Sequence, residues 1–232
     1  MTSTSPLLLA FIVVAATLLP SLVLVGTSYV KVSIVLGSVR NALGTPRMPG
    51  NLVVVGLSVI LSLHIMAPTG AAVVRDAGAA LTEALAREPG SPESVAALGR
   101  AWDAARPHAA RFLRANATSR NRGLFLDLAR RARERHVRDG IAGAELVPAP
   151  TDGDLAVLLP AFVVSELERA FQIAFLVLLP FVVVELVVAN ILVALGLQSL
   201  PSATVSLPFK LLLFVMADGW YQLSRALVLG YR

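Results

Sequence analysis

The sequence contains no cysteine and carries little charge outside one central stretch. Without cysteine the chain has neither a disulfide framework nor a thiolate metal site. No basic residue occurs in the first thirty positions, so the apolar start lacks the basic region of a secretory signal peptide and is expected to stay in the mature protein. Glycine-rich phosphate loops, nucleophile elbows and paired carboxylates are also missing. These absences argue against an enzyme and against a bound cofactor.

Histidine is scarce as well, and its placement argues against a metal site. The three residues are His64, His108 and His136, and no two of them have metal-ligand spacing with a carboxylate on one helix face. We therefore assign no catalytic, cofactor-binding or metal-binding residue.

Apolar residues make up 56% of the chain, which is typical of a protein associated with a membrane. They form two blocks, and the stretch between these blocks holds 13 of the 20 basic and 11 of the 15 acidic residues. We therefore predict an apolar N-terminal part at 1–74, a polar insert at 75–154 and an apolar C-terminal hairpin at 155–232. Acidic and basic residues alternate in the insert, which argues against nucleic-acid binding.

Two runs without charge, 7–30 and 48–74, each exceed the ~20 residues that cross a bilayer as a helix. Pro20 is expected to divide the first run into helices at 7–19 and 21–39. Arg40 and Arg47 lie in the connection near 40–50, so the positive-inside rule places this loop in the cytoplasm. The insert then emerges in the periplasm of a bacterial inner membrane.

The insert itself has the pattern of short amphipathic helices. Ser91 followed by Pro92 is typical of a helix start, and Leu98 and Trp102 continue it at helical spacing. A second amphipathic helix is expected around Leu124. No strand is predicted, and the fold class is all-α.

Four charges interrupt the C-terminal hairpin: Glu166, Glu185, Lys210 and Asp218. Each costs about 2.5 to 3.5 kcal/mol if it faces lipid, so we expect all four to face protein or water. Only 15 residues separate Arg169 from Glu185, about 22 Å of helix, which predicts a poor membrane span. We predict that the four charges pair between subunits of a homo-oligomer. The alternatives are that some reach an interface, and that Arg169 satisfies Glu166 locally.

Several motifs resemble the R component of the bacterial type III export apparatus, called SctR in injectisomes and FliP in flagella. These motifs are RNALG at 40–44, LSLHIMAP at 61–68, SEL-x-x-AF at 165–171, LPFK at 207–210 and DGW at 218–220. The resemblance covers both apolar blocks almost completely and leaves only the insert unassigned.

The resemblance implies a subunit of an export gate that performs no chemistry. Several copies would coil with the S-type and T-type components into a helical ring, in contact with other export-apparatus and basal-body components. Secreted proteins would pass unfolded through the channel. Two features favour the injectisome branch over the flagellar one. Few residues precede LPSL at 19–22, and residues 64–70 have the sequence HIMAPTG.

One stretch departs from the family pattern. After ALG at 194–196 the family has a methionine run that lines the pore, and this chain has Leu197, Gln198, Ser199 and Leu200 instead. The resemblance implies that these four residues form the pore constriction. Gln198 and Ser199 would make it wetter than a ring of soft, apolar methionines.

Two other functions stay open at this point. In a multi-helix ion or solute channel, Glu185, Lys210 and Asp218 would line the pathway. A membrane enzyme scaffold is the second alternative. A channel would bind its small ion or solute alone, whereas an export subunit would need its partners.

Overall fold

The computed structural model describes residues 24–44, 50–88, 90–141, 143, 146 and 148–231. Within these ranges the chain is helical and has no strand, which confirms the all-α class. The helices are α2 (Tyr29–Ala42), α3 (Asn51–Leu85), α4 (Pro92–Asn116), α5 (Ser119–Arg138), α6 (Leu155–Ala194), α7 (Ser202–Met216) and α8 (Gly219–Leu229). The predicted helix at 7–19, its break at Pro20, and Arg47 lie outside the described residues.

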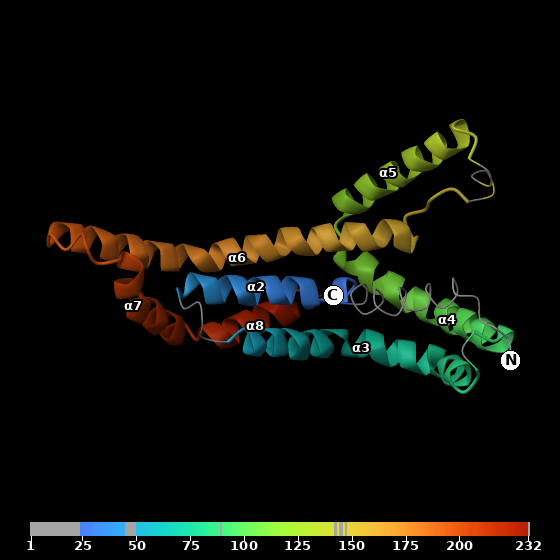
Figure 1. The fold of residues 1–232 in the computed structure, drawn as a ribbon, viewed down its shortest axis with the longest axis horizontal. Coiled ribbons are helices and arrows are strands. Elements are labelled where there is room, and N and C mark those ends of the chain that lie inside the picture. The colour runs from blue at the N-terminus through green and yellow to red at the C-terminus, as the bar shows by residue number, and fades with distance from the viewer. Residues whose placement is uncertain are drawn as a thin grey trace.

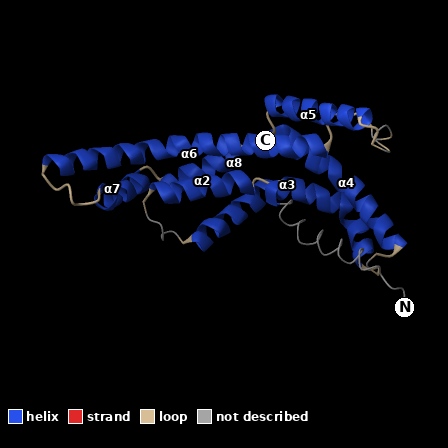
Figure 2. Cartoon of the chain, turned by 45° about the horizontal axis from the view of Figure 1, so that its top comes forward, coloured by secondary structure: helices blue, strands red, loops and turns tan. Residues whose placement is uncertain are grey.

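The molecule is elongated, and α6 runs along most of its length (Figure 1). Helix α2 lies along α6, and α3 lies on the other side of α2. Helices α4 and α5 occupy the end near the start of α6, where α5 diverges from the body, while α7 turns back from the opposite end (Figure 2). The polar insert and the α6–α7 turn therefore lie at opposite ends of the chain.

The main core forms around α2. Its apolar residues Val32, Val35, Leu36 and Val39 recur at helical spacing and are almost completely buried. They pack with apolar residues of α6, α7 and α8, which are Ala170, Phe181, Phe214, Leu223 and Leu227. A second cluster joins the end of α4 to the start of α6 through Phe112 and Phe162, whose ring centroids are 5.5 Å apart.

Both helices of the insert start at a side-chain cap, and the cap at Ser91 is the predicted one. Ser91 accepts a hydrogen bond from the backbone N–H of Ser94 at 3.2 Å, with Pro92 at the first helical position. Thr118 caps α5 in the same way by accepting from the N–H of Asn121 at 3.3 Å. The helix expected from Ser91 onward is confirmed.

Two described helices, α3 and α6, are long and apolar enough to cross a membrane, and the bent pair α7 and α8 would make a third. For α6 this corrects the prediction of a poor span. The helix continues past Glu185 to Ala194, and it stays intact through Pro180. Residues 170–194 thus form an apolar stretch with Glu185 as its single charge.

Candidate functional site

Glu166, within α6, is the centre of a buried cluster of charges. Its carboxylate lies 3.4 Å from the ammonium of Lys31 on α2, and the Lys31 and Glu166 side chains are only 2% and 0% exposed. Arg169, one turn further along α6, donates from Nη1 to Glu166 Oε1 at 3.1 Å. The hydroxyl of Tyr231, which follows α8, donates to the second carboxylate oxygen. The single buried carboxylate thus has three partners.

The partners of Glu166 are themselves well satisfied. The Lys31 ammonium lies 3.4 Å from the centroid of the Tyr231 ring, a cation–π contact. Arg169 also donates to the backbone oxygen of Asn116 at 2.7 Å, at the end of α4. Burial, and then the nearby Glu166 carboxylate, raise the pKa of Tyr231, so its hydroxyl stays a donor. Dense hydrogen bonding of this kind offsets the desolvation cost of buried ions.

This cluster connects four separate parts of the chain: α2, the end of α4, α6 and the residue after the last helix. Arg169 contacts Glu166 as the local alternative expected, but Lys31 and Tyr231 were missed by sequence reasoning. Lys31 precedes Glu166 by more than a hundred residues, and no spacing rule relates them. The one signal in the sequence that Lys31 needs a partner was its position directly after the charge-free run at 7–30.

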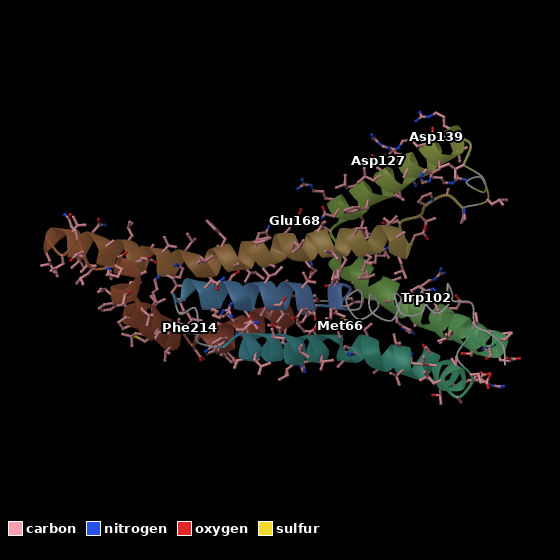
Figure 3. The ribbon with its side chains drawn as sticks, in the orientation of Figure 1. Met66, Trp102, Asp127, Asp139, Glu168 and Phe214 are labelled. Carbon is pink, nitrogen blue, oxygen red and sulfur yellow. The ribbon has the colours of Figure 1, made fainter. Side chains whose placement is uncertain are left out.

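The motif SEL has a second polar residue with a structural role. The Ser165 hydroxyl donates to the backbone oxygen of Ala161 at 2.7 Å and accepts from the N–H of Thr118 at 3.0 Å. Asn121 donates to Ser165 at 3.0 Å and to Glu168 at 3.2 Å. Glu168 lies on the side of α6 near the start of α5 (Figure 3). Ser165 therefore fixes the α4–α5 junction on α6, beside the buried Glu166.

Lys210 on α7 and Glu185 on α6 form an ion pair with a distance of 2.6 Å between Nζ and Oε2. The Lys210 side chain is 5% exposed and that of Glu185 is 40% exposed. Lys210 lies too far from Asp218 along the sequence to pair with it, so its partner was expected on another helix. That partner is Glu185, and it belongs to the same chain. Glu166, Glu185 and Lys210 each have a partner within the chain, and their pairing between subunits stays a prediction.

Asp218 forms the corner between α7 and α8, whose axes differ by 58°. Its φ and ψ of 52° and 45° are left-handed, a conformation that aspartate tolerates better than most residues. A Cβ at Gly219 would lie 2.3 Å from the ring of Phe214, so only glycine fits there. Trp220 packs edge-on against Phe214, whose position beside the corner is visible in Figure 3. The DGW motif therefore builds the corner.

The Asp218 carboxylate is exposed and makes no capping hydrogen bond to α8. It also has no ion-pair partner among the residues that the structure describes. Of the four predicted charges, it is the one without an ion-pair partner in the part of the chain that the structure describes.

The predicted constriction, Leu197 to Leu200, lies in the turn between α6 and α7, at the tip of the elongated molecule (Figure 1). All four residues are exposed. The flanking helices also expose many large apolar side chains: Phe175, Leu176, Val182, Val183, Leu186, Leu212, Val215 and Met216. Such an apolar surface needs lipid or protein to cover it.

Within the described residues, no three His, Asp or Glu side chains lie together in a way that would hold a metal ion. A mostly apolar groove lies between α3 and α8. Within the described residues, the geometry offers packing surfaces and paired charges.

Comparison with known proteins gives consistent matches over nearly the whole chain. Residues 12–227 match the FliP family. The chain is 37% identical over 215 residues to Yop proteins translocation protein R of Yersinia pestis, which covers 93% of this chain and 91% of that protein. It is 39% identical over 219 residues to the hypersensitivity response secretion protein HrcR of Ralstonia nicotianae, with 94% of both chains covered. It is 32% identical over 212 residues to the flagellar biosynthetic protein FliP of Bacillus subtilis, covering 91% of this chain and 86% of that protein.

Proposed function

The chain belongs to the FliP family, and from this premise we propose that it is a core subunit of the type III protein export gate. It forms part of the wall of the channel through which unfolded proteins leave the bacterial cytoplasm, and the injectisome relatives connect that export with virulence. The observation that carries this proposal is the family match over residues 12–227 on an all-helical chain with two span-length apolar helices. We propose that the chain catalyses no reaction and takes no cofactor.

Assembly into a homo-oligomer, together with S-type and T-type subunits, is supported by the surface of α6 and α7. A single chain leaves the apolar side chains of both helices exposed, and neighbouring subunits would bury them. The charges within this hairpin are mostly neutralised inside the chain, so they do not oppose burial. Among the four predicted charges, Asp218 has no ion-pair partner in the described part of the chain, and we propose that its partner comes from another subunit.

The constriction is the second part of this proposal. The α6–α7 turn is exposed at the tip of the hairpin, where turns from several copies can meet on one axis. Leu197 and Leu200 would then form an apolar ring, and Gln198 and Ser199 would make it wetter than a methionine ring. We also propose the division of the chain into three parts after residues 74 and 154. Helix α3 crosses the first of these boundaries and ends at Leu85.

We propose that the end of α2, where Arg40 lies in the last turn, and the connection that follows it face the cytoplasm. Helices α4 and α5 would then lie in the periplasm. A reporter inserted near residue 45 is expected to behave as cytoplasmic, and one inserted near residue 115 as periplasmic, because short loops rich in arginine resist translocation. Paired alkaline phosphatase and fluorescent-protein fusions at both sites would measure this. The opposite pattern at the two sites would overturn the orientation.

An ion or solute channel is the alternative, and the direct test of the proposed function separates the two. Deleting this chain from a cell with the complete apparatus should abolish secretion of its protein substrates, and expressing the native chain should restore it. The chain should also isolate together with the S-type and T-type subunits. Secretion that continues at the native level without the chain would contradict the proposal.

A further inference from the structure

Two opposite charges lie along α8, one directly before its start and one on its exposed side. Asp218 is the left-handed residue that precedes the helix, and Arg225 lies seven residues further on, about 10.5 Å along the helix axis. The opposite side of α8 is buried through Leu223 and Leu227. Arg225 therefore points away from the body of the chain, and Asp218 is exposed at the corner before the helix.

Neither charge has an ion-pair partner within the described part of the chain. Arg225 is exposed and belongs to a helix that contributes to a candidate membrane span. An arginine that faces lipid costs about 2.5 to 3.5 kcal/mol on insertion scales. Each chain thus presents one cation and one anion on an apolar surface, and each of them needs a partner from outside.

Arg225 lies at the edge of the groove between α3 and α8, which Figure 1 shows side by side. The groove has a volume of about 590 Å³, and its lining is Leu61, His64, Tyr221, Ser224, Arg225, Val228 and Leu229. The walls are mainly apolar, with one permanent positive charge. A matching occupant needs apolar bulk together with a negative charge.

The corner between α7 and α8 has this chemistry. Val215 and Met216 are the last residues of α7, shortly before Asp218, and Met216 is 78% exposed. The corner therefore combines large apolar side chains with an exposed carboxylate in a rigid left-handed turn. The corner cannot fold back into the groove of the same chain, because α8, which begins at Gly219 directly after the corner, forms one wall of that groove.

We propose that the α7–α8 corner of one subunit docks into the α3–α8 groove of the next subunit, with Asp218 paired to Arg225. This inference rests on the proposed assembly of several copies. Copies in one membrane share an orientation, so their α8 helices run parallel. In a parallel pair of α8 helices, Asp218 of one copy reaches Arg225 of the next only if the two helices are shifted along their axes by about two helical turns. The contact is therefore head-to-tail, the type that builds open helical arrays instead of closed pairs of chains.

Charge reversal tests this pairing. Tagged and untagged copies would be co-expressed, and the untagged copy that co-isolates with the tagged one would be measured. Asp218→Arg alone and Arg225→Asp alone are each expected to reduce it about tenfold or more, because each places like charges together. The chain with both reversals should recover most of the loss, since the pair is re-formed with opposite polarity. Arg131→Asp on α5, where the arginine pairs with Asp127, is the matched control and should have little effect.

A cross-linking measurement avoids substitution at the left-handed corner residue. The chain has no cysteine, so single cysteines at Met216 in one copy and Leu229 in another are the sole thiols. A short thiol-specific cross-linker should join these two positions between copies, and should not join Met216→Cys to Leu52→Cys at the start of α3.

Two results would overturn the pairing: single reversals that assemble like the native chain, or a double reversal no better than either single one. A cross-link from 216 to 52 with none from 216 to 229 would also overturn it. If native copies fail to co-isolate at all, the proposed assembly fails, and the docking contact fails with it. Self-association without the predicted cross-link would overturn only the docking contact.

Discussion

Replacing Glu166 with glutamine is expected to lower the free energy of unfolding by about 3 to 5 kcal/mol, because it leaves the charges of Lys31 and Arg169 without their carboxylate. Glutamine has nearly the same shape as glutamate, so the loss reports the charge and not a cavity. Denaturant unfolding of the purified chain in detergent, followed by circular dichroism, would measure the change.

Two variants make the Glu166 result interpretable. Adding Lys31→Met to Glu166→Gln should recover part of the loss, because it removes the buried ammonium that the first change leaves unpaired. Glu185→Gln is the matched control: its ion pair with Lys210 is more exposed, and the expected loss is smaller. If Glu166→Gln is as stable as the native chain, the buried cluster does not hold α2, α6 and the C-terminal residues together.

The largest effect on function is expected from replacing both Leu197 and Leu200 with alanine. If the α6–α7 turns of all copies converge on one axis, each loss of side-chain volume is repeated around the ring, and the closed pore becomes wider. Ions and small solutes should then leak through assembled complexes, because hydrophobic constrictions close pores by excluding water. Loss of membrane potential and slower growth, in cells that express the full apparatus, would measure this leak.

The opposite substitution is the control for the constriction. Methionine at positions 197, 198 and 199 should keep secretion and reduce any residual leak, since its soft side chain excludes water and yields to a passing chain. Cells that lack the S-type and T-type subunits should show no leak with either variant. If the double alanine variant assembles and leaks no more than the native chain, the constriction is formed elsewhere.

Much of the fold was predictable because it depends on local patterns. The charge-free run at 48–74 predicted α3, and the Ser91 cap with its periodic apolar residues predicted α4. The prediction for α6 was wrong because it counted the residues between Arg169 and Glu185 as a complete segment. The helix in fact continues beyond Glu185, whose charge is paired with Lys210, so a single carboxylate did not end the apolar stretch.

The candidate site was only partly predictable, because its contacts join distant parts of the chain. The sequence identified Glu166, Glu185, Lys210 and Asp218 as costly charges but did not give their partners. Lys31 and Tyr231 reach Glu166 through the packing of α2 and α8 against α6, which no spacing in the sequence specifies. The left-handed Asp218 and the tight contact at Gly219 likewise became visible only with the position of Phe214.

The central claim, that this chain is a wall subunit of an export gate, is tested most directly by what isolates with it. A tagged chain would be purified from cells that express the complete apparatus, then imaged and assayed for ion conductance in a planar bilayer. We predict a ring-shaped particle that contains several copies together with S-type and T-type subunits, and no conductance from the chain purified alone. Asp218→Asn should reduce the yield of this particle. A chain that isolates without partners and conducts ions by itself would contradict the account and favour the channel alternative.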